Sequence, residues 1–174
     1  MKKILLLLIL VVTALQSVAA EEREVFLNAL EKDLSQNSDS LRTEIMIFSP
    51  IYDQASSEMS DYIPMFNYLL DHRTEECSEG IGGHFYEMFT NYPDKHIEFE
   101  KFLGYLPNDE QQKILVNLTM FITFEFLFEY ENYPIADLEG LFRSSYPFLY
   151  KHPCCIAEFR ESLESRFGKR ITTF

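Results

Sequence analysis

The chain has 174 residues, of which 15 are basic and 28 acidic, so its formal net charge is −13 at pH 7. Binding to nucleic acid or to an anionic membrane surface requires a basic surface, and this charge balance argues against both. Sixteen Phe and ten Tyr residues argue against intrinsic disorder. The length suits one domain with a substantial hydrophobic core.

The N-terminal segment has the layout of a secretory signal peptide. Lys2 and Lys3 form a short basic region, residues 4–15 are almost all apolar, and small residues follow up to Ala20. The apolar run is shorter than the roughly 20 residues that a membrane-spanning helix needs. We therefore predict a cleaved signal peptide at residues 1–20, and the alternative is an uncleaved N-terminal anchor.

Cleavage after Ala20 would leave residues 21–174, which we predict to form a single helical domain with no membrane span. The removed segment contains two lysines and no acid, so the mature chain has 13 basic and 28 acidic residues and a net charge of −15. The lysine-led signal suggests a bacterial protein that is exported to a periplasm or to the outside of the cell. The acidic surface would keep the protein soluble or favour a basic partner.

Three cysteines, Cys77, Cys154 and Cys155, fit an exported protein but do not define a disulfide framework. The most economical pattern is one disulfide from Cys77 to either Cys154 or Cys155, with the third thiol buried or free. Such a bond would close a loop of nearly eighty residues. It would stabilise the fold by about 4 kcal/mol if the gain comes from the entropy of the unfolded chain.

Helical periodicity dominates the mature chain, and alternating strand patterns are missing from it. A helix with one apolar face starts near Ser40, and Pro50 bends or ends it. Residues 74–83 are predicted to be a loop, because they hold three of the six glycines. The other predicted helices cover residues 22–34, 61–72, 84–90, 94–105, 109–131, 135–145 and 153–167.

Prolines and polar residues mark several of the predicted helix ends. Pro64 is expected in the first turn of the helix at 61–72, where proline is tolerated. The side chain of Asn108 is expected to cap the helix at 109–131, because it can accept hydrogen bonds from the free amides of the new helix. Gly168 is expected to end the last helix as a C-cap.

The helix predicted at 109–131 is the most apolar, and a helix that is apolar on most sides is usually enclosed by others. Asn117 and Glu125 interrupt it and are the candidate buried polar residues. A buried carboxylate would have a raised pKa and would mark a site. The simpler interpretation is that their arc of the helix reaches solvent. Asn117 also begins a glycosylation sequon, which we expect to be accidental because it lies in mid-helix.

The tripeptide Asn-Tyr-Pro occurs twice, at residues 91–93 and 132–134, which are 41 residues apart. At the same offset Ile97 matches Leu138, and the period lies in the range of two-helix solenoid repeats. A shared turn chemistry, in which Asn ends one helix and Pro opens the next, would explain the recurrence without a repeat. With two copies, both interpretations stay open.

Two pairs of side chains are candidate metal ligands. His84 and Glu87 are three residues apart, and His96 and Glu100 are four apart, so each pair would share one face of a helix. The Glu-x-x-His pattern that di-iron carboxylate proteins carry on paired helices is missing. We therefore expect two ordinary surface pairs and predict no metal site and no cofactor.

Cysteine and histidine residues form the other candidate cluster. Residues 152–155, with the sequence His-Pro-Cys-Cys, and Cys77 lack the spaced ligand pairs of structural zinc sites. Cys77 with His72 or His84, beside the glycine-rich residues 80–83, would form a nucleophile next to backbone amides. No G-x-S-x-G or comparable signature supports this arrangement, so we favour a non-catalytic protein.

The sequence does not specify a function. We predict an all-α fold of about six or seven helices, packed as antiparallel hairpins in a bundle or a short α-superhelix. Our leading hypothesis is an exported non-catalytic protein that binds an unknown protein or peptide in a groove lined by Phe and Tyr. One alternative is a metal-binding protein or hydrolase that uses the His/Glu or Cys/His cluster. Another is a structural component of an envelope assembly.

Overall fold

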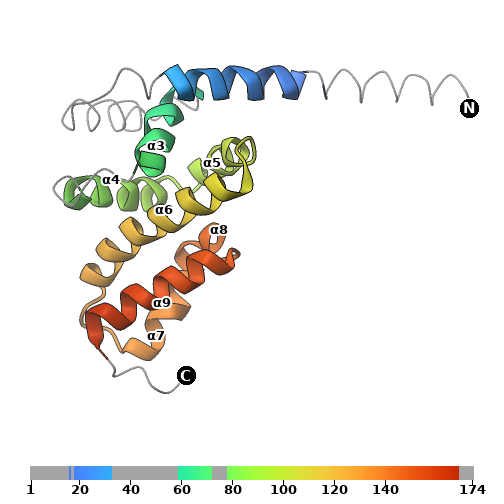
Figure 1. The fold of residues 1–174 in the computed structure, drawn as a ribbon. Coiled ribbons are helices and arrows are strands. Elements are labelled where there is room, and N and C mark those ends of the chain that lie inside the picture. Colours follow the sequence, from blue (N-terminus) through green and yellow to red (C-terminus); the bar gives the residue numbers. More distant parts are fainter. Residues whose placement is uncertain (1–15, 17, 33–58, 72–77, 169–174) are drawn as a thin grey trace, which may run out of the picture.

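The computed structural model describes residue 16 and residues 18–32, 59–71 and 78–168, which form eight helices and no strand (Figure 1). The all-α prediction is confirmed for these residues. One helix covers residues 18–32. The others are α3 (Met59–Asp71), α4 (Ser78–Asn91), α5 (Lys95–Leu103), α6 (Asn108–Glu129), α7 (Ile135–Ser145), α8 (Pro147–Tyr150) and α9 (Pro153–Phe167).

The predicted number of helices, about six or seven for the whole chain, was too low. The additional helix is α8, which forms between the helices predicted at 135–145 and 153–167. Pro147 supplies a backbone already set for the first helical position, and the Tyr150 amide donates to the Tyr146 carbonyl at 3.0 Å. The helix predicted from Ser40 lies outside the described residues. None of the helices in the described part of the chain combines the length and apolar character that crossing a membrane requires.

Helix α6 lies at the centre of the arrangement. Its most extensive contacts are with α4 and α9, and it also packs against α3. Helices α6 and α9 run parallel, because Leu115 contacts Cys155 near their first turns and Phe128 contacts Arg166 near their last (Figure 1). Helices α7 and α8 return the chain between them. The contacts therefore extend beyond the successive antiparallel hairpins that we predicted.

An aromatic cluster joins α6 to α7 and α9. Phe126 is fully buried, and its ring centre lies 5.4 Å from that of Phe142 and 6.2 Å from that of Phe159. The rings of Phe142 and Phe159 stack at 4.3 Å. Aromatic pairs in such geometries stabilise a core by about 0.5–1.5 kcal/mol beyond the burial of their area. This cluster therefore sets the position of α9 relative to α6.

The helix at residues 18–32 docks against α3 and α5. Phe26 is fully buried, and its ring stacks on Phe102 at 5.2 Å and meets Phe66 edge-on at 5.4 Å. At the rim of this contact, Lys101 Nζ lies 2.6 Å from the Glu22 carboxylate. The last residues of the predicted signal peptide, 18–20, are exposed on the same helix. The docking contacts therefore belong to the part of the helix that the predicted mature chain keeps.

The loop predicted at residues 74–83 is wrong from Ser78 onwards, because α4 begins there rather than at His84. We predicted a loop because each glycine lowers helix stability by about 1 kcal/mol relative to alanine. In the structure, Gly82 lies where α4 meets α6. An added Cβ at Gly82 would touch the carbonyl oxygen of Phe121 at 3.5 Å, so the two helices approach closely here. Tertiary packing therefore outweighs the low helix propensity of this segment.

Two of the predicted helix ends are wrong and one is confirmed. Helix α3 starts two residues before Asp61, so Pro64 lies beyond the first turn and withholds an amide from the helical hydrogen bonds. Asn108 is the first residue of α6, and Pro107 takes the cap position with no side-chain cap. Gly168 ends α9 as predicted, with a φ of 68° that favours glycine.

The two Asn-Tyr-Pro segments each precede a helix, but the two helices have different surroundings. In each, the proline lies just before a new helix, α5 or α7. The matched positions Ile97 and Leu138 are not equivalent, because Ile97 is 57% exposed and Leu138 is fully buried. The shared feature in the structure is a backbone hydrogen bond at the start of each helix, from the His96 amide to the Pro93 carbonyl and from the Asp137 amide to the Pro134 carbonyl.

We expect Phe26→Ala to lower the free energy of unfolding by about 3–5 kcal/mol, because it removes a fully buried aromatic ring. The control is Val25→Ala on the same helix, where half of the side chain is exposed and the change should stay within about 0.5 kcal/mol. Urea unfolding of residues 21–174, the predicted mature chain, measures both. Equal effects of the two variants would show that the helix is not docked through Phe26.

A charged contact ties α7 to α9. Arg160 Nη2 lies 2.6 Å from the Glu139 carboxylate, which also accepts a hydrogen bond from the Tyr150 hydroxyl. The hydrogen bond from Arg160 and, less strongly, that from Tyr150 hold the pKa of Glu139 below its ordinary value of 4.5, although partial burial acts in the opposite direction. Arg160 is 61% exposed, so solvent screens the interaction.

Arg160→Gln is expected to lower the free energy of unfolding at neutral pH by up to about 1 kcal/mol. A carboxylate whose pKa is lower in the folded state stabilises the fold above its unfolded pKa, and this stabilisation is lost as the pH falls through the folded pKa. The difference between wild type and variant should therefore be full above pH 4.5 and shrink below it.

Urea unfolding at several pH values measures this dependence. Lys113→Gln, which removes an exposed positive charge from α6, is the control. A difference for Arg160→Gln that stays constant into strong acid would contradict the assignment.

Candidate functional site

The four candidate metal ligands do not come together. The His96 ring stacks on Phe148 at 5.4 Å, and Glu100 forms an ion pair with Lys151. His84 and Glu87 lie on α4. Within residues 18–32, 59–71 and 78–168, no group of three or more His, Cys, Asp or Glu side chains has the geometry to hold a metal ion.

Two of the three candidate cysteines lie next to each other on one helix. Cys154 and Cys155 are both free thiols at the start of α9, and Cys77 lies outside the described residues. Cys155 is fully buried and its thiol faces the Leu115 carbonyl oxygen at 3.7 Å. Burial raises the pKa of this thiol to about 12, so the reactive thiolate form is strongly disfavoured.

The predicted nucleophile cluster keeps only some of its backbone donors, because Gly80 and Ile81 belong to the first four residues of α4, whose amides have no acceptor within the helix. Gly82 and Gly83 lie inside α4, beyond its first four residues, so the helix itself uses their amides. His72 lies outside the described residues. Cys77, the nucleophile of this cluster, also lies outside them, so the arrangement stays a prediction.

Asn117 has a structural role in the core. It is only 3% exposed, and its Nδ2 donates to the Leu69 carbonyl oxygen at 2.6 Å. Leu69 lies in the last turn of α3, where carbonyls have no partner within the helix. Asn117 therefore satisfies a free carbonyl of α3 from the middle of α6. Its burial also hides the glycosylation sequon in the folded protein.

Glu125, the other polar candidate on α6, is half-buried. Its carboxylate lies against α4, where an added Cβ at Gly82 or Gly83 would come within 3.7 or 3.9 Å of it. Glu125 therefore lies in the contact between α4 and α6, away from α9.

We expect Asn117→Ala to lower the free energy of unfolding by about 1–3 kcal/mol, because it leaves the buried Leu69 carbonyl without its donor. Asn108→Ala, the same substitution at an exposed position of α6, is the matched control and should stay within about 0.5 kcal/mol. Thermal or urea unfolding compares the two. A loss at Asn117 no larger than the loss at Asn108 would rule out this role.

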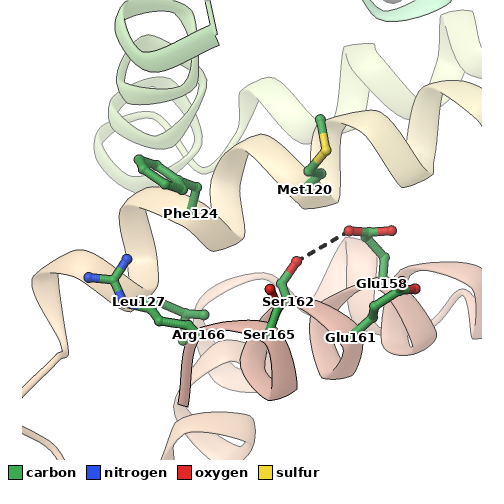
Figure 2. Close-up of a pocket in the computed structure, with 8 residues that line it drawn as sticks. All are labelled: Met120, Phe124, Leu127, Glu158, Glu161, Ser162, Ser165 and Arg166. Carbon is green, nitrogen blue, oxygen red and sulfur yellow. Dashed lines mark hydrogen bonds between the residues drawn. The ribbon is translucent and has the colours of Figure 1, made fainter. Parts of the chain in front are cut away.

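A surface hollow lies between the parallel helices α6 and α9 (Figure 2). Its volume is about 610 Å³, within the range of ligand pockets. The buried side chain of Leu127 belongs to its lining. We call it the α6–α9 groove, and it is lined by Met120, Phe124, Leu127, Glu158, Glu161, Ser162, Ser165 and Arg166.

The α6 wall of the groove carries an exposed apolar stripe. Met120, Phe124 and Phe128 recur every four residues, and they are 40%, 51% and 62% exposed. Each of the three therefore leaves a large part of its apolar side chain in solvent. Figure 2 shows Met120 and Phe124 projecting from the same side of α6. A stripe of this kind on one helix marks a surface that can bind another molecule.

The α9 wall of the groove is polar. Glu158 is half-buried and accepts a hydrogen bond from the Ser162 hydroxyl at 3.2 Å (Figure 2). Burial raises the pKa of the Glu158 carboxyl, and the nearby negative charge of Glu161 raises it further, although the Ser162 hydrogen bond lowers it. The groove therefore holds a carboxylate that is partly desolvated and lies close to a second one.

Arg166 gives the other end of the groove a positive charge. Its guanidinium lies over the Phe128 ring, 5.8 Å from the ring centre, as a cation–π contact. The groove thus has acidic side chains beside the middle of α9 and a basic side chain beside its last turn. The two parts of the groove therefore carry opposite charges, so a charged partner would bind in one orientation.

Sequence reasoning missed this groove. We expected the helix at 109–131 to be enclosed by others, and the exposure of Met120, Phe124 and Phe128 shows that it is not. The available signal was the four-residue spacing of these three side chains. It was hidden because apolar residues also fill the opposite face of the same helix.

No family model, no curated protein and no solved structure matches the chain. Its function is therefore inferred from the geometry of the α6–α9 groove and from the charge of the chain.

Proposed function

We propose that the protein is an exported, non-catalytic helical domain that binds a segment of another protein in the α6–α9 groove. The observation that carries this proposal is the exposed stripe of Met120, Phe124 and Phe128 on a helix whose other side forms the core. Burial of such side chains against a partner would contribute about 25 cal/mol for each Å² of apolar surface removed from water.

The walls of the groove support binding rather than catalysis. An active site needs a nucleophile, acid or base in a defined position beside other reacting groups. The groove has one hydrogen-bonded carboxylate, Glu158, and two serines, and no histidine or cysteine lines it. Its composition of large apolar side chains with a polar rim resembles a protein interface.

The two alternative functions have weaker support. A metal-binding protein would need the candidate histidine, cysteine and carboxylate side chains to converge, and those within the described residues form no group of three or more that could hold a metal ion. A structural component of an assembly would use an apolar surface such as the stripe to bind its own copies. The high negative charge of the chain opposes that contact, because like charges would be brought together.

Site-specific photo-crosslinking in the protein's own host tests the proposal. A benzoylphenylalanine residue in place of Phe124 should crosslink to a discrete second protein. The control places the same residue at Ile97, which is similarly exposed but lies on α5. The crosslink at position 124 should disappear when Phe128→Asp is added, because the charge interrupts the stripe without touching the core.

Two results would refute the proposed function. One is an equal pattern of crosslinks at positions 124 and 97, which would indicate random encounters. The other is the absence of any protein crosslink at position 124 in cells that export the folded chain.

A further inference from the structure

We propose that the α6–α9 groove selects a cationic amphipathic helix, in which apolar side chains pack on the stripe and Lys or Arg side chains pair with Glu158 and Glu161. This inference rests on the proposed function and specifies its partner. It commits to a partner helix rather than to a small molecule or to a second copy of this chain.

The shape of the groove favours a helical occupant. An extended peptide commonly binds by adding a strand to the edge of a sheet, and the described residues contain no strand that could offer such an edge. A helix instead lays its apolar face into a groove between helices. Residues four apart on a helix are separated by about 6 Å along its axis. The stripe of Met120, Phe124 and Phe128 therefore matches partner side chains with the same spacing.

The charge of the groove favours a cationic occupant. The Glu158 carboxylate is half-buried, and the group that donates a hydrogen bond to it is the neutral Ser162 hydroxyl. The Glu158 carboxylate has lost part of its hydration and lies next to the negative charge of Glu161. A positive charge from a partner would stabilise it, because the attraction compensates for the lost hydration. The chain as a whole carries a net charge of −13, which would attract a basic segment over longer distances.

The same charges argue against the other occupants. A second copy of this chain would bring two strongly acidic molecules together. An uncharged apolar molecule would cover Met120 and Phe124 but leave the Glu158 carboxylate desolvated without compensation. Arg166 at the far end fixes the orientation, because the basic residues of the partner should lie toward Glu158 and away from Arg166.

The test uses three synthetic helical peptides with leucines at positions i and i+4 and with lysine, glutamine or glutamate on the polar face. Fluorescence anisotropy at physiological ionic strength measures their affinity for the mature protein, since salt at this level screens contacts between distant charges. We expect the lysine peptide to bind, and the glutamine and glutamate peptides to bind at least about tenfold more weakly.

Matched variants locate the binding. We expect the affinity for the lysine peptide to fall at least about tenfold in the double variant Glu158→Gln with Glu161→Gln. The same loss is expected in the separate variant Phe124→Ser. Glu24→Gln with Glu31→Gln removes the same number of negative charges from exposed positions on the helix at residues 18–32 and should leave the affinity unchanged. Circular dichroism confirms that each variant is folded.

Each remaining outcome overturns the inference in a distinguishable way. If the two double variants lowered the affinity for the lysine peptide equally, only the overall charge of the protein would attract the peptide. Equal affinity for the lysine and glutamine peptides would mean that the acids do not select the partner, although the groove still binds a helix. A dimer that Phe124→Ser dissociates would assign the stripe to a second copy. No binding of the lysine peptide, together with a host protein crosslinked at position 124, would remove the inference and keep the proposed function.

Discussion

The packing of α6 against several helices at once is the constraint on which the rest of the structure depends. Phe126 and its aromatic neighbours hold α7 and α9 on one side, and Asn117 reaches the end of α3 on another. Because α6 is apolar over most of its surface, partners have to cover it from several directions. The part that the described helices leave uncovered is the stripe beside α9.

The parallel arrangement of α6 and α9 creates the groove. Two successive helices with a short turn would run antiparallel, and the ends of such a hairpin would be closed by its turn. Here α7 and α8 carry the chain back, so that α9 starts beside the first half of α6 (Figure 1). Cys155 and Phe159 face the core, and the polar side chains from Glu158 to Arg166 line the groove. One helix therefore supplies both a core face and a binding wall.

The two buried asparagines of the core donate hydrogen bonds to backbone carbonyls of other helices. Asn67 donates to the Leu30 carbonyl at 3.1 Å, and Asn117 donates to the Leu69 carbonyl at 2.6 Å. Leu69 lies in the last turn of α3, where backbone carbonyls need partners from outside the helix. A sequence shows an asparagine in an apolar helix, but it does not show which distant carbonyl lies opposite. Its role is therefore visible only in the folded chain.

Local patterns determined a large part of the secondary structure. Apolar side chains three and four residues apart, with proline and glycine near the ends, located the helices that became α6, α7 and α9 to within about two residues. The same local rules failed at α4, where Gly82 and Gly83 lie inside a helix because α6 packs closely against them. They also missed α8, whose single turn is too short to show a period.

The sequence by itself determined that this chain is acidic, rich in aromatic residues and helical, because these properties depend on composition and on spacing along one segment. Only the tertiary structure decided which apolar face of α6 is buried and which is exposed, since both faces look alike in the sequence. It also decided that Glu158 lies across from Met120 and Phe124, which are more than thirty positions away along the chain. The physical reason is that a site is a set of contacts between segments, and such contacts depend on how the helices pack.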